Sequence, residues 1–199
     1  ARIYDPPPNT LFVDGVDVTK IPLQQLRTAI GVVPQDTLLF SKSIGENIAY
    51  GKPEATFAEI QKAAENSQIL HDIKRFPDQF DTLVGERGVT LSGGQKQRTA
   101  IGRALITDPR ILILDDALSS VDTYTEEKIL KHLHVIMDER TAIIVSHRIS
   151  TIKNADLIIV LDKGQIIEKG DHASLIEMQG MYARIYKKQL LQDALRNDD

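Results

Sequence analysis

The sequence contains no cysteine. This absence excludes disulfide bonds, thiolate catalysis and zinc sites built from cysteine, and it is typical of a reducing compartment. Apolar runs are short: none approaches the ~20 residues that a membrane-spanning helix requires, and no signal peptide is visible. Acidic residues outnumber basic ones, and the net charge of -4 gives no reason to expect a nucleic-acid partner.

The chain has 199 residues, enough for one domain or two closely joined subdomains. Apolar segments at 111–114 and 141–145 predict strands buried on both faces, and a helix is predicted over 93–107. Strands that alternate with helices predict an α/β fold with a mostly parallel sheet. Lys163 and Gly164 predict a hairpin, which adds a small antiparallel β part.

Helix starts are marked by capping patterns. Thr56 with Glu59, and Thr123 with Glu126, predict capping boxes in which two side chains satisfy each other's backbone N–H groups. Residues 1–4 are predicted to be the last turn of a helix.

A serine and two glycines precede the helix predicted over 93–107, in the run Leu91, Ser92, Gly93, Gly94 and Gln95. A helix start presents unpaired N–H groups and the positive end of the helix dipole. Glycines allow a phosphate to approach the backbone, and the serine adds a hydroxyl donor, so an anion site is predicted. The alternative is a plain serine N-cap, which is the commoner use of serine.

Two carboxylates, Asp115 and Asp116, follow the apolar strand at 111–114. In open parallel sheets, ligands bind at the carboxyl ends of the strands. The first carboxylate can hold a magnesium ion and the second can orient a water. The alternative is an ordinary strand-to-helix turn with an aspartate cap.

His147 comes shortly after the strand at 141–145, so we expect it at the same sheet edge as Asp115 and Asp116. There it can contact a phosphate or hold a water. The other histidines lack such a setting, and a structural role is favoured for them: His71, His132, His134 and His172.

Gln35 ends a short apolar strand at 31–33. A neutral amide at this place can ligate a hydrated metal, although Pro34, Gln35 and Asp36 also form an ordinary turn sequence.

Taken in order, these motifs resemble the ATP-binding-cassette (ABC) ATPases along nearly the whole chain. Residues 91–95 match that family's signature motif in full, and residues 111–115 resemble its Walker B strand. Gln35 resembles the Q-loop glutamine and His147 the switch histidine. Ser120, Val121 and Asp122 resemble the D-loop.

Residues 82–88 read Thr-Leu-Val-Gly-Glu-Arg-Gly, close to the loop that exporter-type members place before the signature motif. The resemblance is therefore to the multidrug and lipid exporters. It implies that Gln35 and Glu86 lie near a transmembrane domain and link ATP occupancy to transport. It also implies a place at the cytoplasmic face of the plasma (inner) membrane.

The resemblance implies a two-chain ATP site in which two ATPase domains face each other head to tail. The signature residues 91–95, with Ser92, Gly94 and Gln95 on the γ-phosphate, would contact ATP held by the partner, and Ser120 and Asp122 would belong to the same interface. Asp115 and Gln35 would hold Mg²⁺. The catalytic residues would be Asp116, His147 and Gln35.

The resemblance also implies a P-loop NTPase-like fold in which residues 1–199 form the C-terminal portion of the ATPase domain. Residues 1–35 and 108–199 would belong to its α/β core, and residues 36–107 to a mainly helical subdomain that carries the signature motif.

The family's phosphate-binding loop, Gly-x-x-x-x-Gly-Lys-[Ser/Thr], is absent from the sequence. The one Gly-Lys pair, Gly51 and Lys52, is followed by Pro53, and Glu46 stands where the first glycine is needed. Because residues 2–6 resemble the end of the helix that follows this loop, we expect the loop immediately upstream in a longer gene product. This chain alone is expected to be inactive as an ATPase.

Asp116 is a second departure, because active members carry glutamate there. The aspartate side chain is one methylene shorter than that of glutamate, so its carboxylate is displaced. A displacement of ~1 Å at a reacting centre can lower the rate about a hundredfold. The signature motif serves the partner's nucleotide, whereas Asp116 serves its own. An intact signature beside a weakened carboxylate predicts one half of an asymmetric heterodimer.

Other interpretations stay open. The chain could be a regulatory half that binds ATP without turnover, or part of a homodimeric exporter in which Asp116 works as the base. DNA-repair and chromosome ATPases share the signature motif, but they place a long coiled coil after the Q-loop. Residues 36–90 show no sustained heptads.

Overall fold

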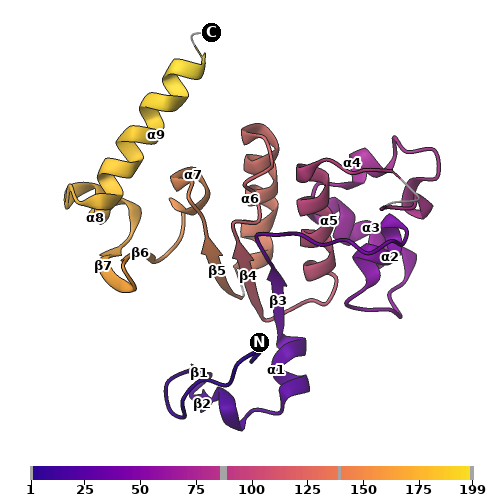
Figure 1. Ribbon diagram of the computed structural model, residues 1–199, viewed down its shortest axis with the longest axis horizontal. Coiled ribbons are helices and arrows are strands. Elements are labelled where there is room, and N and C mark those ends of the chain that lie inside the picture. Colours follow the sequence, from indigo (N-terminus) through magenta and orange to yellow (C-terminus); the bar gives the residue numbers. More distant parts are fainter. Residues whose placement is uncertain (1, 86–88, 139, 198–199) are drawn as a thin grey trace. The chain divides into compact units, whose positions relative to one another are not determined.

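The computed structural model describes residues 2–85, 89–138 and 140–197. The chain divides into two compact units, residues 1–144 and 145–199, and Figure 1 traces its elements in order. Within the described residues, no helix combines the length and the apolar character that crossing a membrane requires.

The first unit begins with a small antiparallel hairpin. Strand β1 (Phe12–Val13) pairs with β2 (Val16–Asp17). Asp14 and Gly15 make the turn with φ values of 48° and 75°, as a tight two-residue hairpin turn requires.

The helical turn predicted at residues 1–4 is wrong for the residues that the structure describes. Arg2 has a φ of 51°, a left-handed conformation that a right-handed helix does not contain. Its guanidinium instead donates hydrogen bonds to the carbonyls of Val18 and Ile21, at 3.2 and 3.0 Å.

Short elements lead from the hairpin into the sheet: a 3₁₀ turn, η1 (Val18–Lys20), then α1 (Leu23–Ala29) and strand β3 (Ile30–Val33). Helices then fill much of the chain up to residue 105. They are α2 (Ile44–Ala49), α3 (Phe57–Asn66), α4 (Leu70–Ile73), η2 (Gln79–Asp81) and α5 (Gly93–Leu105).

The capping box predicted at Thr56 and Glu59 is confirmed at the start of α3. Ser43 and Glu46 form another at the start of α2. Helices α2 and α3 pack against α5, together with the side chains of a core that includes Ile44, Ile48 and Ile73.

Strand β3 belongs to a three-stranded sheet of order β3-β4-β5. Strands β4 (Ile111–Asp115) and β5 (Thr141–Val145) are joined through α6 (Thr123–Met137). The pairing of β3 with β4 is parallel, with Ile30 opposite Ile111 and Val33 opposite Leu114. Strand β3 precedes the helical segment and β4 follows it, and their parallel pairing confirms the predicted α/β fold.

Helices α5 and α6 cover one face of this sheet. Val33, Leu112 and Leu114 are buried there against residues of both helices. On the other face, Val32 is 44% exposed and Ile143 is 49% exposed. The prediction of burial on both faces is therefore wrong for β5, and in β4 Ile111 and Ile113 are only partly buried. The reason is that both helices pack on the same side of the sheet.

The start of α6 also differs from the prediction. Asp122, not Thr123, is the N-cap residue, and its side chain accepts a hydrogen bond from the backbone N–H of Thr125. With Asp122 as the N-cap, the third residue of the helix is Thr125, so Glu126 does not stand at the capping-box position. Glu126 is a buried residue, 2% exposed.

The second unit contains α7 (Ile149–Ile152), β6 (Ile158–Asp162), β7 (Gln165–Gly170), α8 (His172–Glu177) and α9 (Met181–Asn197). The predicted hairpin is confirmed: β6 and β7 pair antiparallel, and the turn residues Lys163 and Gly164 have φ values of 47° and 78°. Glu168 in β7 accepts hydrogen bonds from the backbone of Met181 and Tyr182 at the start of α9.

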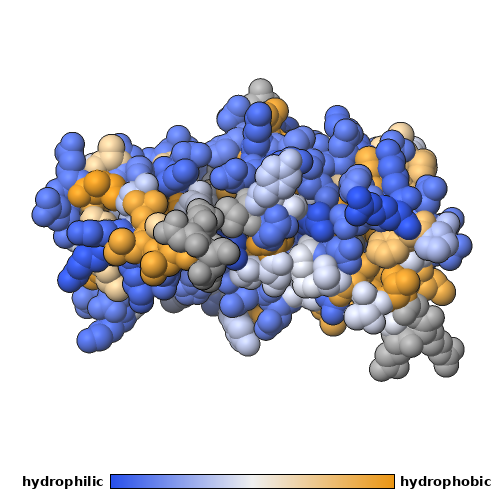
Figure 2. All heavy atoms as spheres, turned by 90° about the horizontal axis from the view of Figure 1, so that it is seen from above, coloured by the Kyte–Doolittle hydropathy of each residue, from blue (hydrophilic) through white to orange (hydrophobic). Residues whose placement is uncertain are grey.

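Apolar side chains also reach the surface. Figure 2 shows patches of hydrophobic surface set among hydrophilic residues, over elements of both units. In the second unit, exposed apolar side chains include Leu161, Ile166 and Leu191.

Asn47 and Arg103 tie the segment after Gln35 to two helices. Asn47, fully buried in α2, accepts a hydrogen bond from the N–H of Phe40 at 2.9 Å and donates to the Phe40 carbonyl at 3.0 Å. Arg103 of α5 donates to the Asn47 side chain at 2.8 Å and to the Leu38 carbonyl at 2.9 Å. Burial lowers the pKa of Arg103.

We expect Asn47→Ala to lower the free energy of unfolding by about 2–4 kcal/mol, because it leaves the Phe40 N–H and an Arg103 donor buried without this partner. Chemical denaturation measures the change. Asn66→Ala is the matched control, since Asn66 lies on α3 with no side-chain hydrogen bond to the described residues, and it should stay within about 0.5 kcal/mol. Equal effects of the two substitutions would contradict the assignment.

Candidate functional site

The first turn of α5 is built as a capping box. The Ser92 hydroxyl oxygen accepts a hydrogen bond from the Gln95 N–H at 3.3 Å, and the Gln95 side-chain oxygen accepts one from the Ser92 N–H at 3.0 Å. The N-cap interpretation of Ser92 therefore holds. It leaves room for the predicted anion site, because a hydroxyl that accepts this bond can still donate its hydrogen, and Ser92 and Gly93 are exposed.

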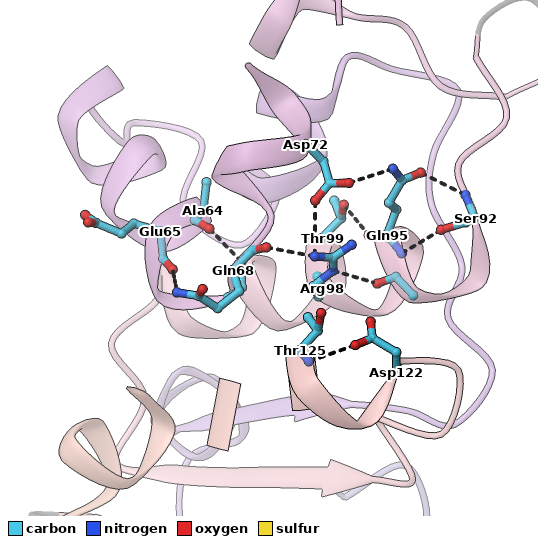
Figure 3. A network of polar contacts seen from close by, with 12 residues as sticks. Ala64, Glu65, Gln68, Asp72, Ser92, Gln95, Arg98, Thr99, Asp122 and Thr125 are labelled. Carbon is cyan, nitrogen blue, oxygen red and sulfur yellow. Dashed lines mark hydrogen bonds and ion pairs between the residues drawn. The ribbon is translucent and has the colours of Figure 1, made fainter. Parts of the chain in front are cut away.

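Figure 3 shows the side-chain contacts that hold the same turn to α4. The Gln95 side-chain nitrogen donates to Asp72 of α4 at 2.9 Å. The other oxygen of Asp72 forms an ion pair with Arg98 at 3.1 Å. Arg98 also donates to the Gln68 carbonyl at 2.9 Å, so α5 is held to the chain between α3 and α4.

The two glycines lie against the loop after β4. A Cβ added to Gly94 would stand 3.0 Å from the Ser120 carbonyl oxygen, and one added to Gly93 would stand 3.0 Å from the Ser120 Cβ. A side chain at either position would be a tight contact, so the neighbouring loop would have to shift by a few tenths of an ångström. Residues predicted to lie in two separate motifs, Gly93 and Gly94 in one and Ser120 in the other, are thus in contact.

Gln97 fixes this contact. It is 4% exposed, donates to the Ser119 hydroxyl at 3.0 Å and accepts from the Ser120 N–H at 2.9 Å. Asp122 follows in the same loop, and hydrogen bonds from Thr125, first from its backbone N–H, hold the pKa of the Asp122 carboxyl below its usual value. The N-cap of α6 is therefore lost only as the pH falls through that lowered pKa.

Asp115, Asp116 and Gln35 lie at the carboxyl ends of paired strands, as predicted. Because Val33 is opposite Leu114 in parallel register, the residues that follow them reach the same sheet edge. Asp115 and Gln35 are exposed there. Asp116 has a φ of 45°, and its carbonyl accepts a hydrogen bond from the Ser119 hydroxyl at 2.9 Å.

The magnesium ion that the family resemblance implies would need oxygen ligands at this edge of the sheet. The described residues contain no cluster of three or more His, Asp or Glu side chains that could hold a metal. Magnesium usually binds one or two protein carboxylates and completes its coordination with waters and substrate phosphates. Asp115 with the amide oxygen of Gln35 is such an incomplete set.

His147 is exposed two residues after β5, and its carbonyl accepts a hydrogen bond from Gln189 at 2.6 Å. It belongs to the second unit, and its closeness to Asp115 and Asp116 stays a prediction. Glu86 lies outside the described residues.

Structural roles fit two of the remaining histidines. The His172 ring bonds to the Tyr182 hydroxyl at 2.7 Å and packs edge-on against Tyr186. The His132 ring bonds to the Lys128 carbonyl one turn back, at 2.9 Å.

Asp72 and Gln97 were not predicted as parts of the site. A signal for Gln97 does exist, because it is a polar residue in line with Ala100, Ile101 and Ala104 on the apolar face of α5. Asp72 carries no such signal, since a single aspartate in a short helical segment is usually solvated.

We expect Gln97→Leu to increase the hydrogen-exchange rate of the Ser120 amide about tenfold, because this N–H loses its acceptor while the volume of the side chain is kept. Amide exchange followed by mass spectrometry measures the change. Gln61→Leu, at an exposed position of α3, should leave that amide unaltered. An unchanged rate in Gln97→Leu would show that other contacts hold the loop.

Comparisons with known proteins agree with these motifs. A family model described as "ABC transporter" matches residues 1–119. The "ATM1-type heavy metal exporter" of Novosphingobium aromaticivorans is 45% identical over 193 residues, which are 97% of this chain and 32% of the exporter. The "Iron-sulfur clusters transporter atm1, mitochondrial" of Aspergillus fumigatus is 44% identical over 190 residues, which are 94% of this chain and 26% of that protein.

A solved structure is similar throughout the fold. The chain matches a bacterial Atm1-family ABC exporter with ATP bound at a TM-score of 0.86 and 45% identity, covering 90% of this chain and 32% of the exporter chain. The chain thus spans about a third or less of the length of these relatives.

Proposed function

Because the chain belongs to the ABC transporter family, we propose that it is a nucleotide-binding part of a membrane exporter and works with ATP and Mg²⁺ at an interface with a second ATPase domain. The observation that carries the proposal is the exposed start of α5, where Ser92, Gly93 and Gly94 lie against the Ser120 loop. Helix starts with glycines and a free hydroxyl donor are suited to binding phosphate.

In this proposal the start of α5 serves the nucleotide held by the partner. The Ser92 hydroxyl donates to the γ-phosphate, and the first backbone N–H groups of the helix add further donors. Because the glycines contact Ser120, the 116–122 loop would lie beside that nucleotide. Asp122 and Ser120 then lie at the same interface, where a movement of one ATPase domain changes the contacts of the other.

Asp115 and Asp116 serve a nucleotide on their own side. Asp115 and Gln35 would hold magnesium, which would neutralise part of the negative charge of the phosphates. Asp116 accepts a proton from the attacking water. Its short side chain makes it a poor base, since general-base catalysis is worth about 10²–10⁴-fold and depends on placement. We therefore propose that this chain is the subunit with the slower site of a heterodimer.

Two alternatives differ in what Asp116 does. In a homodimeric exporter, Asp116 is the working base of both sites. In a regulatory half, the chain binds ATP without turnover at its own site. The intact Ser92–Gly94 turn, which serves the partner, favours a subunit that still supports hydrolysis on the other side.

The transmembrane domain of the exporter is the other proposed partner, with Gln35 and the 82–88 loop near the contact. The relatives' names give different cargoes, heavy metals for one and iron–sulfur clusters for another, and the second is mitochondrial. We propose a membrane exporter with its ATPase domain on the cytoplasmic face. The plasma membrane as its location stays a prediction.

We expect residues 1–199 on their own to show no magnesium-dependent ATP hydrolysis. The sequence has no phosphate-loop lysine and no loop of backbone N–H groups for the β- and γ-phosphates. Release of phosphate by the purified chain measures this. Turnover that disappears in Asp115→Ala would contradict the prediction, because Asp115→Ala removes activity only if this chain itself is the enzyme.

In the complete exporter, Ser92→Arg should reduce ATPase activity at least about a hundredfold, because a long cation blocks the phosphate site that α5 offers to the partner. Asp116→Asn should cost less than about twofold, since the site that it serves is already slow. Steady-state phosphate release measures both. If Asp116→Asn instead removes nearly all turnover, Asp116 is the working base and the asymmetric proposal is wrong.

A further inference from the structure

We propose that Asp72 is a positioning residue for the phosphate site: it orients the Gln95 side chain, which in turn holds the Ser92 hydroxyl ready to donate to the ATP phosphate. The inference rests on the proposed function, because it concerns the same start of α5. It assigns a role to a residue of α4 that precedes the signature run by about twenty positions.

The chemistry of Asp72 decides which way the Gln95 amide faces. A carboxylate only accepts hydrogen bonds, so the amide nitrogen must be the end that meets Asp72, at 2.9 Å. The amide oxygen is then turned to the Ser92 N–H, at 3.0 Å. With the amide reversed, its oxygen would face the carboxylate and its nitrogen would face another N–H donor, so both contacts would be repulsive.

The second oxygen of Asp72 makes this orientation firm. It pairs with Arg98, and the two side chains are only 20% and 14% exposed. A partly shielded pair is weakened less by water and salt than a surface pair. Arg98 is itself fixed by the Gln68 and Gly94 carbonyls, at 2.9 and 3.3 Å. Figure 3 shows these contacts around Asp72.

The consequence reaches Ser92 through the capping box. With Gln95 held, Ser92 keeps its φ of -63° and ψ of 162° and its hydroxyl oxygen accepts from the Gln95 N–H. The hydroxyl hydrogen finds no acceptor among the described residues and can turn toward a phosphate. Both ends of the Gln95 amide are engaged within this chain. Gln95 therefore supports the nucleotide through Ser92. The direct contact of Gln95 with the γ-phosphate that the family resemblance implies stays a prediction, because the amide nitrogen keeps a second N–H.

A double-mutant cycle in the complete exporter tests this role. Asp72→Leu removes the acceptor at similar volume, and it should lower kcat/KM for ATP about tenfold when Ser92 is present. In a Ser92→Ala background the same substitution should change kcat/KM by less than about twofold, because the group that Asp72 positions is gone. Asp72→Asn keeps one acceptor oxygen for Gln95, so it should recover most of the activity.

A measurement without nucleotide separates positioning from turnover. In Asp72→Leu, hydrogen exchange at the Gln95 amide should rise about tenfold, because the capping box opens. Asp108→Asn is the matched control: it breaks the 2.7 Å ion pair of Asp108 with Arg140, beyond the opposite end of α5, and should leave both kcat/KM and Gln95 exchange unchanged. If Asp72→Leu fails to fold, Asp72→Ala, which also removes the acceptor, carries the test in the same cycle, with the same loss of about tenfold expected to vanish in Ser92→Ala.

Each result is decisive. Equal losses from Asp72→Leu with and without Ser92 would show a general structural role and overturn the inference, as would unchanged exchange at Gln95. If Ser92→Ala alone leaves ATP turnover intact, the proposed function itself is wrong, and the role of Asp72 fails with it. A loss in Ser92→Ala together with a multiplicative loss in Asp72→Leu leaves the proposed function standing and removes only Asp72.

Discussion

The packing of α5 against several neighbours at once is the constraint on which the rest of the first unit depends. Its apolar side faces the sheet through Ala100, Ile101 and Ala104, and it also contacts α2, α3 and β3. Its first turn is held by Asp72, its middle by Gln97 and its last turns by Arg103. Because one helix carries all three ties, the Ser92–Gln95 turn, the 116–122 loop and the segment after Gln35 are held in fixed positions relative to one another.

Polar contacts fix the position of α5, because apolar contacts alone would not be specific enough. Hydrophobic packing is non-directional, and it would tolerate a small sliding of α5 along the sheet. The bonds from Gln97 to Ser119 and Ser120 fix the helix at one position along its axis. The near contact of Gly94 with the Ser120 carbonyl removes the remaining space. Gly94 therefore allows the close approach of two backbone segments within the same chain.

The sequence predicted the parts of the structure that depend on local chemistry. The hairpin at Lys163 and Gly164, the capping box at Thr56 and the strand ending at Asp115 follow from turn residues, caps and apolar runs, and the structure confirms them. Exposure of β5 could not be predicted, because an apolar strand looks the same whether or not a layer covers it. The α6 cap was placed one residue late, since Asp122 and Thr123 are both good N-cap residues. The role of Asp72 depends on a contact across 23 residues, which no local pattern reveals.

The register of the sheet has a consequence for the order of folding. Parallel pairing places Val33 beside Leu114, and the helices α2 to α5 all lie between these two residues along the chain. Closing so long a loop costs conformational entropy, and this entropy is lost before the strand pairing contributes any stabilisation. The helical cluster around Ile44, Ile48 and Ile73, whose contacts are closer in sequence, can form early and shorten the effective loop. We therefore expect the pairing of β3 with β4 to form late, and until it forms the unpaired backbone N–H and C=O groups of both strands are open to other chains.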